Sequence, residues 1–198
     1  KFIELEKKLE KIDSTTEKGD LFEYFNYAYF CINKNKYQIK DVYDFDSIPS
    51  SLKKEYNLKP QSGRERGCDG MVIHTNGNKF SYQTKFYKSK KISSKDLMTS
   101  YQVGQRLDGW YVFSNVHNIS HEFFKDRQKK PRCILQSDLA NLDDVFFKNL
   151  MLFVQNEKLI EHKLEPRPYQ TDAVNDICKG FESANKGKFI SACGTGKT

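Results

Sequence analysis

The chain has 198 residues, of which 37% are hydrophobic, 14% aromatic and 30% charged. This composition suits one domain of ordinary size plus a short further segment, and it excludes a disordered chain, which would lack aromatic residues. Lys and Arg number 33 against 26 Asp and Glu, a net charge of +7. The charge fits a polyanionic partner, although a Lys-rich solvated surface would explain it equally well.

Cysteine usage and hydropathy bear on the compartment. The five cysteines are odd in number and form no Cys-x-x-Cys pair, which favours free thiols in an intracellular protein over a disulfide scaffold or a zinc ribbon. No apolar run approaches the ~18 residues of a membrane span. We therefore expect a cytoplasmic or virus-associated protein without a membrane partner.

The first part of the chain predicts mainly helices. Residues 1–12 have the spacing of an amphipathic helix. A second helix is expected to follow the N-cap candidate Ser14 and to run to about Ile32. Residues 37–43 suit a short strand and residues 52–56 a short helix.

A β-hairpin is the clearest local signal. Residues 70–75 and 79–87 alternate like strands and flank Asn76-Gly77-Asn78. Because a strand has a period of two, Gln83 and Lys85 share one face. The residues expected on the opposite, core-facing side are Phe80, Tyr82, Thr84 and Phe86.

The later elements complete an α/β order. A helix is predicted over residues 94–107 and a buried strand over residues 109–116. A polar loop with a short helix follows at residues 118–131, then a strand at residues 132–136. One final helix is expected over residues 137–154, begun by Ser137 or Asp138.

The hairpin also carries a chemical pattern. Asp69, separated by thirteen residues from Gln83-Thr84-Lys85 and preceded by Glu23 on a helix, resembles the PD-(D/E)XK nuclease superfamily. The Mrr-like branch, in which Gln replaces the second acid, and the nucleases of translocating single-chain restriction enzymes match best. The resemblance covers about residues 15–155. It implies an α/β fold, a restriction-endonuclease-like core with a central mixed sheet flanked by helices.

The resemblance also implies a site. Glu23, Asp69, Gln83 and Lys85 would be the catalytic residues, and Mg²⁺ (or Mn²⁺) the cofactor. Asp69, the Gln83 amide oxygen and the Thr84 carbonyl would hold the ion, with Glu23 reaching it through water. Lys85 would orient the attacking water or stabilise the charged transition state. With one carboxylate fewer than usual, we expect a millimolar demand for magnesium.

The strand register decides whether these groups converge. A two-residue loop at Asn76-Gly77 would place Asp69 opposite Thr84, with its side chain on the wrong face. A three-residue loop, Asn76 to Asn78, would place Asp69 opposite Lys85 and on the right face. We therefore predict the longer loop or a kink at Gly70.

The C-terminal residues carry a second pattern. Tyr169-Gln170 precedes a predicted helix at residues 171–181, and a predicted strand at residues 188–190 leads into Gly194-x-Gly196-Lys197-Thr198. The latter resembles a Walker A phosphate-binding loop. Together the motifs resemble motif Q and motif I of a superfamily-2 helicase, in which ATP would bind only in the full-length protein. The implied nucleotide-binding residues are Tyr169, Gln170, Gly194, Gly196, Lys197 and Thr198.

These patterns lead to one preferred function and two alternatives. Residues 1–164 are expected to form a magnesium-dependent DNA endonuclease domain, and residues 165–198 the truncated start of a RecA-like helicase domain. The whole would be a restriction, defence or viral nuclease-helicase, with DNA and the remainder of the helicase chain as partners. A homodimer on DNA stays open. The alternatives are a non-catalytic DNA-binding module that positions the motor and a protein-interaction domain.

Overall fold

The computed structural model describes residues 1–58, 67–87, 91–124, 129–160, 168–183 and 186. The chain divides into two compact units, Lys1–Ile160 and Glu161–Thr198. The first unit carries the sheet and all but one of the described helices. The second contributes a single described helix, α8 (Pro168–Ser183).

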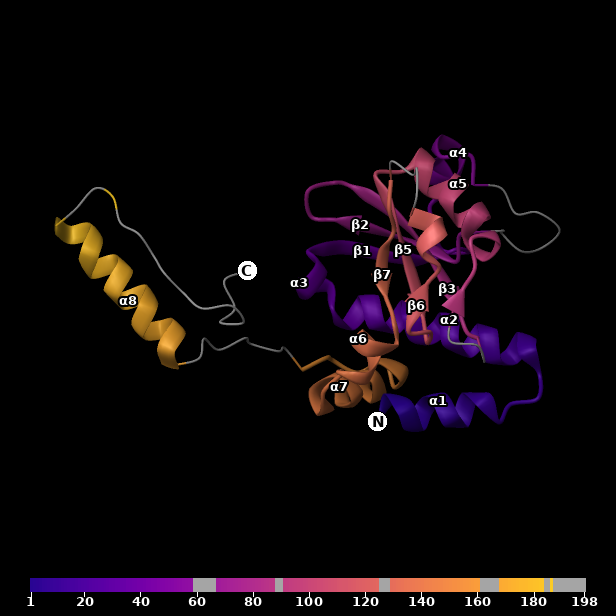
Figure 1. The fold of residues 1–198 in the computed structure, drawn as a ribbon, viewed down its shortest axis with the longest axis horizontal. Helices are drawn as coiled ribbons and strands as arrows, with labels where there is room; N and C mark the ends of the chain where they lie inside the picture. Colours follow the sequence, from indigo (N-terminus) through magenta and orange to yellow (C-terminus); the bar gives the residue numbers. More distant parts are fainter. Residues whose placement is uncertain (59–66, 88–90, 125–128, 161–167, 184–185, 187–198) are drawn as a thin grey trace. The chain divides into compact units, whose positions relative to one another are not determined.

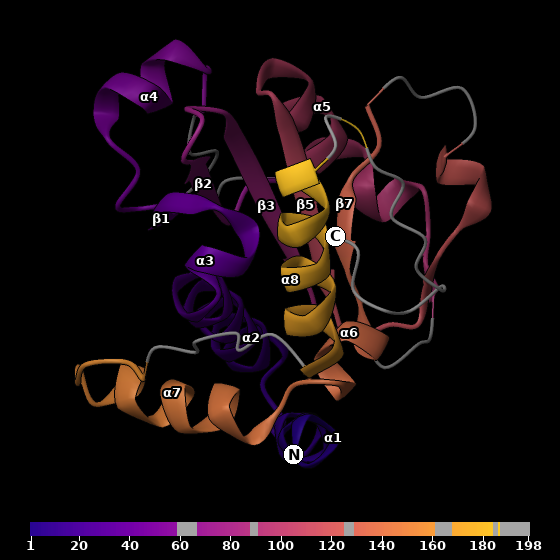
Figure 2. The same ribbon diagram turned by 90° about the vertical axis from the view of Figure 1, so that its left-hand side faces the viewer.

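A five-stranded mixed sheet forms the centre of the first unit. Its strands follow the order β1-β2-β3-β5-β7, which Figure 2 shows from left to right. The pairs β1–β2 and β2–β3 are antiparallel, whereas β3–β5 and β5–β7 are parallel. The bounds are β1 Ile39–Asp44, β2 Gly70–His74, β3 Lys79–Lys85, β5 Gly109–Ser114 and β7 Arg132–Ile134. This is the α/β sheet flanked by helices that the sequence predicts.

Helices cover both faces of this sheet. The helices α1, α2 and α7 lie together in the lower part of Figure 1, and α4 and α5 lie in the upper part. The bounds are α1 Phe2–Glu10, α2 Thr15–Ile32, α3 Lys34–Tyr37, α4 Ser50–Glu55, α5 Met98–Arg106, α6 Gln136–Ala140 and α7 Asp144–Val154. The 3₁₀ turns are η1 Lys95–Leu97 and η2 His121–Phe124.

The core under α2 is aromatic. Alternate residues of β3 enter it, since Phe80 and Tyr82 are buried beside Phe22, Phe25 and Phe30 of the helix. The ring centroids of Phe30 and Tyr82 lie 5.3 Å apart, a separation typical of favourable aromatic pairs. The opposite face packs separate clusters around Trp110 and Met71. The predicted core-facing set on β3 is therefore confirmed.

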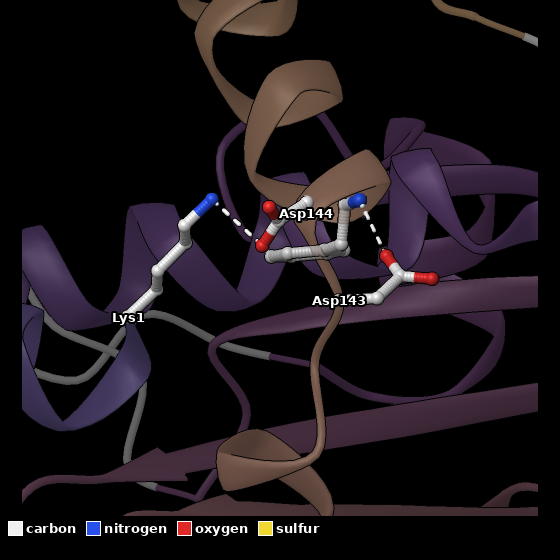
Figure 3. A network of polar contacts seen from close by, with 4 residues as sticks. Lys1, Asp143 and Asp144 are labelled. Atoms are coloured by element: carbon white, nitrogen blue, oxygen red, sulfur yellow. Dashed lines mark hydrogen bonds and ion pairs between the residues drawn. The ribbon is translucent and has the colours of Figure 1, made fainter.

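Two local predictions differ from the structure. The helix expected over residues 137–154 is two helices, α6 and α7, because the Asp143 carboxylate accepts the Phe146 N–H at 2.8 Å and starts a new helix. Figure 3 shows this cap beside the ion pair of Lys1 Nζ with Asp144 Oδ1, 2.7 Å. The sequence also missed a small parallel sheet of β4 (Lys91–Ile92) and β6 (Asn118–Ile119).

The hairpin loop has three residues, as one of the two predicted solutions requires, but it lies one position earlier. His74 N–H donates to the Asn78 carbonyl at 2.8 Å, so the loop is Thr75–Gly77. Gly77 has a φ of 87°, a conformation that costs glycine least. The register pairs Gly70 with Tyr82 and Ile73 with Lys79.

Candidate functional site

Asp69 is placed by the backbone at the beginning of β2. Its N–H donates to the Tyr82 carbonyl at 2.9 Å, although the register partner of Tyr82 is Gly70. Two residues thus face one, the arrangement of a β-bulge. The predicted kink at Gly70 is therefore present, and the predicted pairing of Asp69 opposite Lys85 is wrong.

Gly70 is required by close packing at this point. A Cβ there would collide with the Tyr43 carbonyl oxygen and with the ring of Tyr82. The Tyr82 hydroxyl donates to the same Tyr43 carbonyl at 2.9 Å, which fixes the ring. A side chain at position 70 would consequently displace β1 or the ring, and with it the carboxylate of Asp69.

The Asp69 carboxylate gathers donors from the end of β3. Gln83 Nε2 lies 2.8 Å from each of its two oxygens, and the Thr84 N–H donates to Oδ2 at 2.6 Å. Hydrogen bonds to a carboxylate are shorter and stronger than those between neutral groups. The structure thus brings together three of the sequence-predicted residues, Asp69, Gln83 and Thr84.

The backbone of Thr84 faces Asp69 because β2 begins at Gly70, opposite Tyr82, and so has no strand residue to pair with Thr84. Tyr82 offers its carbonyl to the Asp69 N–H, and groups two residues apart on a strand point the same way. The Thr84 N–H accordingly reaches the carboxylate, and the Thr84 carbonyl faces the same edge. The side chain of Thr84 points the other way, toward α2.

Asn26 of α2 is a contact that the sequence analysis missed. It is completely buried, and its Nδ2 donates to Thr84 Oγ1 at 2.7 Å. The bond ties the helix to the strand between Gln83 and Lys85. The available signal was an amide among the aromatic residues of the buried face of α2, where a polar group needs a partner.

Lys85 and Glu23, the two remaining predicted catalytic residues, differ in how far they are buried. Lys85 is half-buried, and its positive charge lowers the pKa of Asp69. Its carbonyl accepts Ser114 Oγ at 2.5 Å, which anchors the end of β3 to β5. Glu23 lies one helical turn before Asn26 on α2 and has an exposed side chain.

Burial raises the pKa of Asp69 to about 6, well above that of a solvated carboxyl. The Thr84 N–H, the charge of Lys85 and the Gln83 amide oppose the rise because they favour the ionised form. Asp69 is therefore mostly ionised at neutral pH but desolvated. A cation placed beside it would recover the lost solvation.

The donor set fits a hard divalent cation. The Gln83 amide is only 4% exposed, and its Oε1 is buried with no hydrogen-bond partner in the described structure. With the Asp69 carboxylate and the Thr84 carbonyl, it makes an all-oxygen set of the kind magnesium prefers. Among the described residues, no three His, Cys, Asp or Glu side chains form a metal-binding group. Binding here would therefore depend on amide and backbone oxygens.

The nucleotide-binding prediction falls mostly outside the described residues, which exclude Gly194, Gly196, Lys197, Thr198 and the strand predicted at 188–190. Tyr169 and Gln170 are described. They lie in the first turn of α8 and not before the helix, because Pro168 begins it. Proline favours this first position, where its missing N–H costs no hydrogen bond.

Comparison with known proteins supports the fold. No family model matches the chain, and no curated protein matches it. One similar solved structure is the ATP-dependent Type ISP restriction-modification enzyme LlaBIII bound to DNA, with a TM-score of 0.59 and 19% sequence identity. The match covers 89% of this chain and 11% of that chain. The two share a fold, and this chain spans about a tenth of that enzyme. Within the described residues, no helix is long and apolar enough to cross a membrane.

Proposed function

We propose that the first unit is a magnesium-dependent endonuclease domain that hydrolyses phosphodiester bonds in DNA. One observation carries the proposal: the Asp69 carboxylate, the Gln83 amide and the Thr84 backbone converge at the end of β3. Lys85 follows on the same strand and acts electrostatically on Asp69. The fold shared with a DNA-bound restriction-modification enzyme supports the same conclusion.

Each residue has a distinct task in this proposal. Asp69, Gln83 Oε1 and the Thr84 carbonyl hold Mg²⁺ or Mn²⁺, and Glu23 contributes through water. The ion supplies charge neutralisation at the phosphate and a more acidic water. Lys85 places its ammonium beside the scissile phosphate, where negative charge increases in the transition state. Asn26 holds Thr84 and thereby positions the backbone between the two ligands.

We propose further that this domain belongs to a nuclease-helicase, with the boundary between residues 164 and 165. The support is the pair of motifs at Tyr169-Gln170 and Gly194-Thr198. In this view DNA and the rest of the helicase are the partners, and ATP is bound only by the full-length protein.

A non-catalytic DNA-binding module is the second candidate. A single observation favours it: the described hydrogen-bonded group around Asp69 contains one carboxylate, where metal-dependent nucleases usually need more anionic charge. The net charge of +7 serves binding as well as cleavage. This candidate predicts salt-sensitive DNA binding without cleavage in any divalent metal.

Cleavage of DNA by the purified chain separates the two candidates. We expect the wild type to nick or linearise plasmid DNA in millimolar Mg²⁺ or Mn²⁺, and Asp69→Ala to abolish this. Asp108→Ala is the matched control, because the Asp108 carboxylate also accepts a β3 N–H, that of Lys79, at 2.8 Å. Equal cleavage by the wild type and Asp69→Ala would refute the site, and no cleavage by the wild type would favour the binding module.

A further inference from the structure

The amide of Gln83 lies beside the Asp69 carboxylate, where a second ligand of a cation bound by Asp69 would lie. Its Nε2 is equidistant from Oδ1 and Oδ2, at 2.8 Å from each. An oxygen atom at that position would lie 2.8 Å from the carboxylate oxygens, about the separation of two neighbouring ligands around one Mg²⁺. Gln83 therefore presents its donor side to Asp69, and its Oε1 points away.

This orientation follows from electrostatics. A carboxylate only accepts hydrogen bonds, whereas an amide has one accepting and one donating side. Without a cation, the donating side of Gln83 must face Asp69. Once a cation binds the carboxylate beside the amide, the same N–H group would point at a positive charge, so the amide oxygen must face the ion instead.

We propose that the Gln83 side-chain amide is a turning amide with two orientations. Without metal its Nε2 donates to Asp69, and with metal a half-turn of its terminal torsion lets Oε1 ligate the ion. This inference rests on the proposed function, because it assumes that a divalent cation binds at Asp69. Oε1 and Nε2 share one carbon, so the half-turn exchanges their positions without moving the strand. The amide N–H of the metal-free form substitutes for the missing positive charge.

Two features of the site permit the turn. The terminal torsion of Gln has a broad, roughly two-fold profile, so both orientations are accessible. Oε1 has no hydrogen-bond partner in the described structure, so on that side nothing has to be broken. Asp69 keeps the Thr84 N–H throughout, because that bond comes from the backbone.

The turn can be observed directly by NMR on the whole chain. In the metal-free form, the Gln83 amide and the Thr84 N–H donate to the same oxygen, Asp69 Oδ2. Their protons are consequently close enough for a strong nuclear Overhauser cross-peak. Gln83→Glu, which removes the side-chain amide, assigns that signal. The exposed Gln102 of α5 supplies a control amide away from the site.

The test is a Mg²⁺ titration in which the Thr84 N–H shift reports binding. We expect the Gln83–Thr84 cross-peak to be lost in step with that shift, while the Gln102 amide is unchanged. A cross-peak that persists at saturation would overturn the turning amide and leave the metal site standing. A Thr84 signal that does not respond to tens of millimolar Mg²⁺ would overturn both.

Discussion

The two ends of β3 carry similar residues in different surroundings. At the Lys79 end, the Asp108 carboxylate accepts a strand N–H, and both side chains reach solvent. At the Lys85 end, Asp69 also accepts a strand N–H, but it is desolvated and faces an amide whose oxygen is buried without a partner. The first arrangement closes a strand end. The second leaves a desolvated carboxylate and an unpaired amide oxygen, both of which a cation would stabilise. The environment of these residues, and not their types, therefore marks the candidate site.

The largest expected difference between the two ends concerns the lysines. Lys85→Ala should lower the rate of DNA cleavage by about 10²–10³-fold, the usual effect of removing one group that stabilises transition-state charge. Lys79→Ala is the matched control, because it lies on the same strand and face, about 20 Å away in extended backbone. Single-turnover cleavage rates compare them, and a similar loss in both variants would show that Lys85 has no special role.

A smaller difference should be seen in stability. Because burial raises the pKa of Asp69 to about 6, the native state binds its proton more tightly than the unfolded state. This group therefore favours folding below about pH 4, and that contribution is lost as the pH rises toward 6. Above pH 6 the buried carboxylate is charged and lowers the free energy of unfolding, and Asp69→Asn removes this destabilising charge.

With divalent metal removed by a chelator, the free energy of unfolding of Asp69→Asn should consequently exceed that of the wild type at pH 8 by about 1–3 kcal/mol. The difference should vanish near pH 4. Urea unfolding at the two pH values measures it. Asp108→Asn, at the exposed end, should show no such pH-dependent gain. A destabilised Asp69→Asn at pH 8 would mean that the carboxylate is held by more than the contacts described above.

Local sequence signals accounted for much of this architecture. Asn76-Gly77 predicted the hairpin, and strict alternation predicted which side of β3 carries Gln83 and Lys85. These features are encoded within a few residues, because turn preference and strand period are local properties. The same holds for α2, whose start is marked by the Ser14 cap.

Contacts between distant segments were beyond sequence reasoning. Asn26 meets Thr84 across 58 positions of sequence, and nothing local indicates that pairing. The two-against-one arrangement at Asp69 depends on how Gly70 packs against Tyr43 and Tyr82. The division of the last helix at Asp143 was missed because the apolar pattern continues across it, while the cap is set by a single side chain.

The central claim is that one divalent cation binds between Asp69 and Gln83. Crystals of the chain grown with Mn²⁺ would test it through the anomalous signal of that ion. The account predicts a peak within bonding distance of an Asp69 carboxylate oxygen and of Gln83 Oε1, with the amide turned from its metal-free orientation. An ordered Mn²⁺ elsewhere, with Gln83 Nε2 still on Asp69, would contradict it.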